Sequence, residues 1–168
     1  LVEHYIISSG MREIIKSTSI ADEFKRIYAC RYYYDETHTA TWPAQVVNYT
    51  AKTQYIFRIN KQVLDVNDDA DLNKFVPQTE RPIPFERMIY IADGLTDVPC
   101  MRLVKEYGGK SIAVYSSNDV VAKSLKDVGR VNYIAKADYS SGSEMEQIVQ
   151  SILDHMKADE VLKKYEEK

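Results

Sequence analysis

The most informative part of the sequence is Met88-Ile89-Tyr90-Ile91-Ala92-Asp93-Gly94-Leu95-Thr96-Asp97-Val98-Pro99. Its apolar first half is typical of a buried parallel strand, and Pro99 is typical of the first turn of a helix. Asp93 therefore falls at the carboxyl end of the strand and Asp97 near the start of the helix. In open α/β sheets this edge binds ligands, and helix N-termini there favour anions. An Asp-Gly turn followed by an N-cap aspartate explains the same residues without a ligand.

Outward from this stretch, short apolar runs alternate with helical patterns. This alternation predicts an α/β protein with a mostly parallel sheet and helices on both faces. The expected strands are Glu3–Ser8, Lys25–Tyr33, Arg87–Ile91, Lys110–Tyr115 and Val131–Ala135. The expected helices are Gly10–Thr18, Thr50–Val63 with Thr50 as N-cap, Val98–Tyr107, Asp119–Val128 and a last helix that starts at Ser143, with a frayed tail from Lys163 to Lys168.

Two segments depart from this rhythm. Residues 28–49, with three consecutive tyrosines, a polar turn and Trp42-Pro43, predict a β-hairpin-like insertion. Residues 65–84 contain three prolines and the acidic run Asp68-Asp69-Ala70-Asp71, which predicts a long surface connection. The acidic run lacks the glycine and the spaced glutamate of a calcium loop, so we interpret it as a solvated loop.

Composition narrows the class of protein. The 168 residues, 45% of them hydrophobic, fit a single globular domain over residues 1–168. The formal net charge is −3 and no basic block occurs, so we expect no nucleic-acid partner. No apolar run could span a bilayer, and we expect a cytoplasmic protein with no membrane partner. Cys30 and Cys100 form no metal-ligand pattern, and we expect both to be reduced.

Two further positions could bind an anion. Ser8-Ser9-Gly10 follows the first strand, and such a turn points backbone N–H groups and hydroxyls at a phosphate, although it is also an ordinary helix entry. Lys52 lies early in a helix, where its charge opposes the helix dipole. That position does not stabilise the helix, which makes a functional role for Lys52 plausible.

Together these stretches resemble the haloacid dehalogenase (HAD) superfamily, and specifically its phosphoserine-phosphatase-like phosphohydrolases. The resemblance matches Ser8 to the second motif of the family, Lys52 in Tyr49-Thr50-Ala51-Lys52-Thr53 to the third, and Asp93 and Asp97 to the fourth. It continues through Met101–Lys105 and Gly108–Val114, and so covers most of the chain. Ala92 replaces the glycine that usually precedes the first aspartate of the fourth motif.

The first motif of the family, Asp-x-Asp, has no match at a strand end. Asp69-Ala70-Asp71 has the same residue pattern, but it lies in a polar loop, so we reject it as the first motif. The chain also begins at Leu1 directly in a strand-like run, so we expect a piece of a longer protein that lacks the N-terminal strand and cap. In the family that strand lies between Glu3–Ser8 and Arg87–Ile91, which predicts that these two strands do not pair with each other.

The resemblance implies a magnesium-dependent phosphohydrolase that acts on a small phosphorylated molecule through an aspartyl-phosphate, with the nucleophile outside this chain. Asp93 would ligate Mg²⁺, and Asp97 would hold Lys52 or the waters of the metal. Lys52 would neutralise the phosphate. Ser8 would hydrogen-bond a phosphoryl oxygen, with Ser9 as the alternative donor and Gly10 in the same substrate-binding turn.

Two other functions stay open. A non-catalytic α/β module could retain the phosphate-site geometry for binding or for regulated assembly. A receiver-like domain that is phosphorylated on its own aspartate fits less well, because its acidic pair should lie near the start of the chain. Asp-x-Asp after an apolar run upstream of Leu1 would favour the enzyme over the module.

Overall fold

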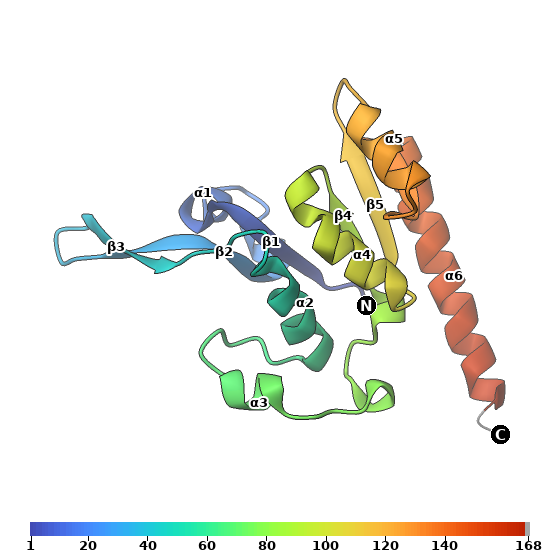
Figure 1. Cartoon of the computed structure of the whole chain (residues 1–168), viewed down its shortest axis with the longest axis horizontal. Coiled ribbons are helices and arrows are strands. Elements are labelled where there is room, and N and C mark those ends of the chain that lie inside the picture. Colours follow the sequence, from blue (N-terminus) through green and yellow to red (C-terminus); the bar gives the residue numbers. More distant parts are fainter. Residues whose placement is uncertain (167–168) are drawn as a thin grey trace. The chain divides into compact units, whose positions relative to one another are not determined.

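The computed structural model describes residues 1–166. The chain divides into two compact units, Leu1–Pro77 and Gln78–Lys168, and each is described by itself. Figure 1 shows the elements of both units in chain order. The expectation of a single domain over the whole chain stays a prediction.

The first unit contains a three-stranded sheet with strand order β1-β2-β3. β1 pairs with β2 in parallel, and β2 pairs with β3 in antiparallel fashion, so the hairpin expected within residues 28–49 is confirmed. Among residues 1–166, no strand pairs with β2 on the β1 side beyond Cys30, and the β2–β3 ribbon extends outward there (Figure 1). The elements of this unit are β1 (His4–Met11), α1 (Arg12–Lys16), a 3-10 turn (Ala21–Glu23), β2 (Phe24–Tyr34), β3 (Ala40–Gln45), α2 (Lys52–Lys61) and α3 (Asp69–Asn73).

The core of the first unit forms where α2 packs on the sheet. Tyr28 of β2 stacks on Tyr55 of α2 with ring centroids 4.5 Å apart, and the Tyr28 hydroxyl donates to the Leu64 carbonyl at 3.1 Å. Burial raises the pKa of Tyr28 to about 12, because the phenolate would lose its hydration. This aromatic pair fixes the face of α2 that carries its other buried residues.

The start of α2 differs from the prediction. Thr50 does not cap the helix; its hydroxyl and the Ala51 N–H both donate to Asn48 Oδ1, at 2.8 and 2.9 Å. The Lys52 N–H donates to the Asn48 carbonyl at 3.2 Å. Asn48 therefore organises the first turn, because its short side chain accepts from a hydroxyl two residues ahead and from a backbone N–H three residues ahead.

The second unit contains an all-parallel sheet with strand order β4-β5-β6. Successive strands are joined by helices, which is the βαβ arrangement that the sequence predicts for this half of the chain. Its elements are 3-10 turns at Gln78–Glu80, Phe85–Arg87 and Leu95–Asp97, with β4 (Ile89–Ala92), α4 (Val98–Glu106), β5 (Lys110–Tyr115), α5 (Val120–Asp127), β6 (Tyr133–Lys136) and α6 (Glu144–Glu166).

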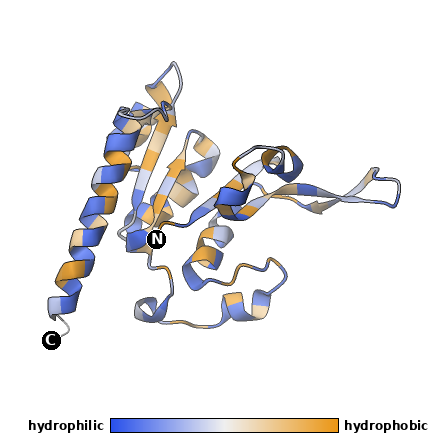
Figure 2. Ribbon diagram, turned by 180° about the vertical axis from the view of Figure 1, so that it is seen from behind, coloured by the Kyte–Doolittle hydropathy of each residue, from blue (hydrophilic) through white to orange (hydrophobic). Residues whose placement is uncertain are grey.

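Helices cover both faces of this second sheet. On one face Ala113 of β5 packs with Met101 of α4 and Leu125 of α5. On the other face Ile112 and Val114 of β5 pack with residues of α6. Because successive strand residues point to opposite faces, one strand builds both cores. Figure 2 shows hydrophobic residues along these strands, with polar residues on the outer sides of the helices.

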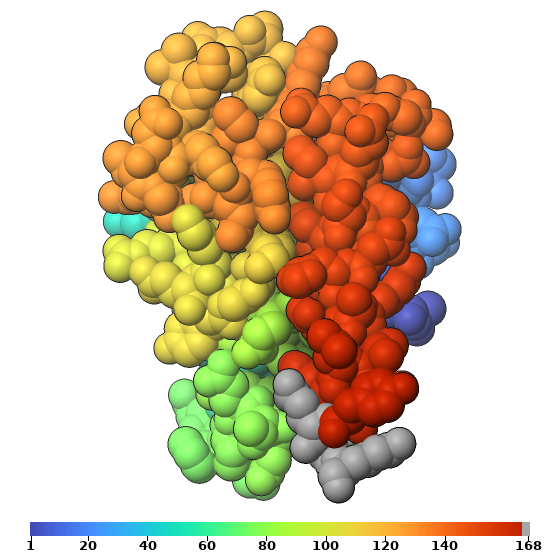
Figure 3. Space-filling view, turned by 90° about the vertical axis from the view of Figure 1, so that its right-hand side faces the viewer, coloured from blue at the N-terminus to red at the C-terminus, as the bar shows by residue number. Residues whose placement is uncertain are grey.

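The last helix is longer than expected. α6 runs along the surface of the second unit (Figure 3) and continues through Glu166, so the tail is helical from Lys163 to that residue. The remainder of the expected frayed tail lies outside the described residues. Charged residues interrupt the apolar positions of α6, and no helix within residues 1–166 meets the length and hydropathy of a membrane span.

The broad fold class is therefore confirmed, but the sheet is not one continuous layer. The chain forms a mixed α/β structure with two small sheets, of which one is entirely parallel. β1 and β4, the two strands that we expected not to pair, belong to different sheets.

Candidate functional site

The turn after β4 presents the first candidate carboxylate. Asp93 is exposed and directly follows the last residue of the strand. Gly94 adopts ordinary extended backbone, with φ −111°, so no left-handed conformation requires a glycine here. The Asp97 N–H donates to the Gly94 carbonyl at 3.1 Å and closes the turn. The expected placement of Asp93 at the carboxyl end of the strand is confirmed.

Asp97 is buried, with 6% of its surface exposed. The Tyr90 hydroxyl donates to Asp97 Oδ1 at 2.6 Å, and the Thr96 hydroxyl lies 3.4 Å from Oδ2. Asp97 occupies the N-cap position of α4, yet within the described chain its side chain makes no capping hydrogen bond. Capping of α4 therefore does not explain the Asp97 carboxylate, which instead accepts a hydrogen bond from Tyr90 of β4.

Tyr90 was missed from the sequence because it lies within an apolar run. Burial raises its pKa far above the ordinary range, and the neighbouring Cys100 and Asp97 raise it further, because a second anion beside them is unfavourable. Tyr90 therefore remains a neutral hydrogen-bond donor to Asp97. A tyrosine in an otherwise aliphatic strand was the signal, since a buried phenol requires a polar partner.

Ser8, Ser9 and Gly10 form a bulge in β1. Ile7 pairs with Tyr28 and Met11 pairs with Cys30, so three residues of β1 lie opposite one residue of β2. We expected the strand to end at Ser8 and a helix to start near Gly10; instead the strand resumes at Met11, and α1 has only five residues. Such bulges redirect side chains and are frequent beside active sites.

Within this bulge the Gly10 N–H donates to the Ser8 hydroxyl oxygen at 2.9 Å. Ser8 is half-buried and Ser9 is exposed. A phosphate bound by the bulge would take the serine O–H as a donor while the serine oxygen keeps the Gly10 N–H. The bulge is compatible with the expected role of Ser8, and the roles of Ser9 and Gly10 stay predictions.

Lys52 is the first residue of α2 and is buried, with 5% of its surface exposed. Long ammonium side chains are rarely buried unless they are paired. The position early in a helix is confirmed, while Lys52 and Ser8 belong to the first unit and Asp93 and Asp97 to the second. The predicted ion pair between Lys52 and Asp97 stays a prediction.

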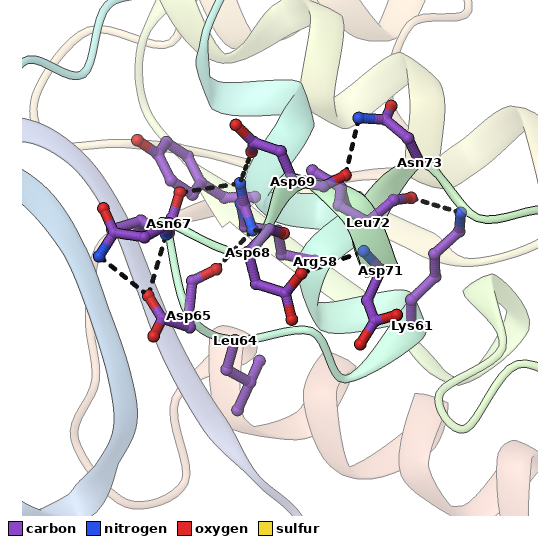
Figure 4. Close-up of polar contacts among 12 residues, drawn as sticks. Arg58, Lys61, Leu64, Asp65, Asn67, Asp68, Asp69, Asp71, Leu72 and Asn73 are labelled. Carbon is purple, nitrogen blue, oxygen red and sulfur yellow. Dashed lines mark hydrogen bonds and ion pairs between the residues drawn. The ribbon is translucent and has the colours of Figure 1, made fainter.

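A buried arginine of α2 binds the acidic loop, residues 65–73. The guanidinium of Arg58, which is 1% exposed, donates to the carbonyls of Asp65, Val66 and Asp68 at 2.6, 3.1 and 3.1 Å, and to Asp69 Oδ1 at 2.8 Å (Figure 4). Backbone carbonyls and a carboxylate converge on this group in the way that they surround a metal ion.

A second cation secures the end of the acidic loop. Lys61 Nζ donates to the carbonyls of Leu72 and Lys74 at 2.6 and 2.8 Å, and Asp68 Oδ1 accepts the Asp71 N–H at 3.0 Å as the N-cap of α3. The loop is therefore an ordered structure rather than a purely solvated one. The signal in the sequence was Arg58, a charged residue at a position of α2 that is otherwise apolar or buried, and the prediction of a solvated loop did not take it into account.

No preformed metal site accompanies Asp93. Among residues 1–166, no group of three or more His, Cys, Asp or Glu side chains could hold a metal ion. A single exposed carboxylate fits Mg²⁺, which retains several waters, only if further ligands come from elsewhere. The assignment of Asp93 as a magnesium ligand stays a prediction.

Comparisons with known proteins do not name an activity. The chain is 30% identical over 161 residues to an uncharacterized protein of Borreliella burgdorferi, a match that covers 86% of this chain and 55% of that protein. The chain thus spans about half the length of this relative. No family model matches the chain, and no solved structure matches it.

Proposed function

We propose that this chain is the larger part of a magnesium-dependent phosphohydrolase of the HAD superfamily, with a Rossmann-like core and a nucleophilic aspartate outside the chain. The observation that carries the proposal is the acidic turn after β4, where the exposed Asp93 precedes a buried Asp97 that Tyr90 holds at 2.6 Å. A fixed carboxylate beside an exposed one at the carboxyl end of a parallel strand suits a phosphate site.

The proposed reaction has two steps. An aspartate oxygen forms a bond to phosphorus while the bond to the ester oxygen breaks, and the alcohol leaves with a proton from the second aspartate of the Asp-x-Asp motif, which acts as the general acid. Water then attacks the phosphorus of the acyl phosphate and gives its proton to that second aspartate, which releases inorganic phosphate and regenerates both carboxyl groups. Mg²⁺ would neutralise the phosphate while both bonds to phosphorus change.

Each matched residue has one task in this proposal. Asp93 supplies a carboxylate oxygen to Mg²⁺, and Asp97 orients the charged groups around it. Ser8 donates its hydroxyl to a phosphoryl oxygen, and Lys52 compensates the negative charge that develops there. The burial of Lys52 supports this role, because a preorganised charge acts more strongly away from water.

The alternative is a non-catalytic module that binds a phosphorylated ligand. It is favoured by one observation: within the described residues Asp93 lies in no cluster of three metal ligands. Both hypotheses predict binding of a phosphorylated ligand, but only the enzyme would hydrolyse it.

The first prediction tests the enzyme in the longer protein that includes the upstream segment. We expect magnesium-dependent hydrolysis of a generic aryl phosphate, and we expect Lys52→Ala to lower kcat about 10²- to 10³-fold, the effect of removing one preorganised charge-stabilising group. Lys123→Ala is the matched control, because Lys123 is exposed and pairs with Asp119 at 2.7 Å. Wild-type kcat in Lys52→Ala would remove Lys52 from the site. Phosphate binding without turnover in the wild type would favour the module.

A further inference from the structure

The outer part of the β2–β3 ribbon, residues 32–44, consists only of exposed residues (Figure 1). Tyr33 and Trp42 lie opposite each other in its antiparallel register and are 65% and 70% exposed. A two-stranded ribbon is only marginally stable in water unless a further strand or another layer packs on it. Exposed aromatic residues on such a ribbon are therefore typical of an interaction surface.

The outer edge of β3 is protected against pairing with another strand. In the register of β2 against β3, Thr41 and Ala44 are extra residues of β3, so this strand is bulged twice. Pro43 between them has no backbone N–H to donate. Bulges and prolines are the features by which edge strands avoid edge-to-edge pairing.

The opposite edge of the ribbon, formed by β2, has no such protection. Residues 31–34 of β2 run without a bulge, and among residues 1–166 no strand pairs with them on the side away from β3. Its central residues, Tyr32–Tyr34, include neither a charge nor a proline. A regular, uncharged edge strand presents backbone N–H and C=O groups to which another strand can bind.

The sequence of this edge is complementary to itself. It is Arg31-Tyr32-Tyr33-Tyr34-Asp35. When two copies run antiparallel about Tyr33, each tyrosine lies opposite a tyrosine, and Arg31 of each copy lies opposite Asp35 of the other. Aromatic pairs and pairs of opposite charge both stabilise antiparallel strands. A shift of this register by two residues would break both charge pairs.

Asp35 is fixed by the hairpin turn. Its Oδ1 accepts hydrogen bonds from the Thr37 hydroxyl at 2.7 Å, from the Thr39 N–H at 3.0 Å and from the Thr37 N–H at 2.9 Å. These bonds hold the pKa of Asp35 below its ordinary value, so this carboxylate is charged at neutral pH. Arginine is always charged, so each copy carries both members of the charge pair.

We propose that the β2 edge of the ribbon is a homodimer interface, at which a second copy of this chain pairs antiparallel about Tyr33. The charges of the edge select this partner, because one cation and one anion in this order match a second copy. A nucleic acid or an anionic membrane would instead require a surface of net positive charge. The inference does not depend on the proposed function.

The pairing would join the two ribbons into four strands. Residues that lie directly opposite each other share a face, so Tyr33 and Trp42 of both copies would form one aromatic row. The four aromatic residues of each ribbon, Tyr32–Tyr34 and Trp42, expose about 400–500 Å² per copy if an aromatic side chain offers about 150–250 Å². An interface of this size lies at the small end of the range for specific complexes, and we expect a micromolar Kd.

The test measures the monomer–dimer equilibrium of the longer protein by sedimentation velocity, from about 1 to about 200 μM. Tyr33→Lys replaces the central aromatic pair by two ammonium groups and should raise Kd about 10- to 30-fold. Tyr139→Lys is the matched control, because Tyr139 is 69% exposed and lies outside the ribbon, and it should leave Kd unchanged. Circular dichroism should show wild-type secondary structure in both variants, because both side chains are exposed.

A cycle of charge variants tests the register. Arg31→Glu brings two carboxylates together at each end of the paired segment and should raise Kd about 10-fold. Asp35→Asn removes the charge but keeps an oxygen that can accept the hydrogen bonds of the turn. It should weaken the dimer when residue 31 is arginine and tighten it in the double variant Arg31→Glu/Asp35→Asn.

Two results would overturn the interface. One is a wild type that stays monomeric up to about 200 μM, and the other is a wild-type Kd in Tyr33→Lys. An equal effect of Asp35→Asn in the presence and absence of Arg31→Glu would overturn the register about Tyr33. Loss of the dimer in Tyr33→Lys, together with opposite effects of Asp35→Asn in the two backgrounds, would support the proposed interface.

Discussion

Two acidic regions of this chain look alike in sequence and differ in structure. The acidic loop around Asp69 is filled by Arg58, whose guanidinium binds three carbonyls and the Asp69 carboxylate. In the acidic turn after β4, Asp93 is exposed, and the Tyr90 hydroxyl donates to Asp97 Oδ1 at 2.6 Å. The difference is that the Asp69 carboxylate already binds a guanidinium of the chain, whereas the Asp93 carboxylate is exposed to solvent.

The largest expected effect on stability comes from removing the internal cation. Arg58→Met leaves three carbonyls of the acidic loop without their donor, and we expect the free energy of unfolding of the first unit to fall by about 2–4 kcal/mol. Urea unfolding gives the loss, and hydrogen exchange should show faster opening of residues 65–73. The matched control is Arg102→Met, which removes an exposed arginine. Unchanged stability in Arg58→Met would mean that the acidic loop does not depend on Arg58.

A smaller effect is expected at the acidic turn. Tyr90→Phe removes the hydrogen bond to Asp97 and should cost about 1–2 kcal/mol at pH 7. The raised pKa of Tyr90 means that the folded state keeps its proton where the unfolded state, with an ordinary tyrosine pKa near 10, loses it. This contribution is present below about pH 10 and is lost as the pH rises further.

The free energy of unfolding above pH 10 should therefore differ in its pH dependence between the wild type and Tyr90→Phe. Wild-type stability should fall more steeply above pH 10 than that of Tyr90→Phe, as measured by urea unfolding across the pH range. Parallel profiles would show that Tyr90 ionises as easily in the folded protein as in the unfolded one, and that its bond to Asp97 contributes little.

Sequence reasoning succeeded where periodicity and backbone chemistry act locally. The apolar runs of the second unit predicted its strands, and the Val98 helix starts where Pro99 indicates. The hairpin was predicted from its aromatic residues and polar turn. These elements depend on neighbours in the sequence, so the pattern contains the information.

The features that the sequence did not predict all depend on contacts between residues that are separated in the sequence. The bulge at Ser8–Gly10 is visible only from the register of β1 against β2. The acidic loop was interpreted as solvated because its cation, Arg58, lies on another element. The role of Tyr90 depends on a side chain seven residues away across a turn. Each required a partner that local patterning does not identify.

The assignment of the phosphate site to the acidic turn can be tested with two aspartate variants. In the longer protein, magnesium-dependent hydrolysis of an aryl phosphate is compared between Asp93→Asn and Asp69→Asn, with circular dichroism to confirm the fold of both. We expect Asp93→Asn to abolish hydrolysis and Asp69→Asn, which changes a carboxylate already paired with Arg58, to retain it. Wild-type activity in Asp93→Asn would contradict the assignment of the site to the acidic turn.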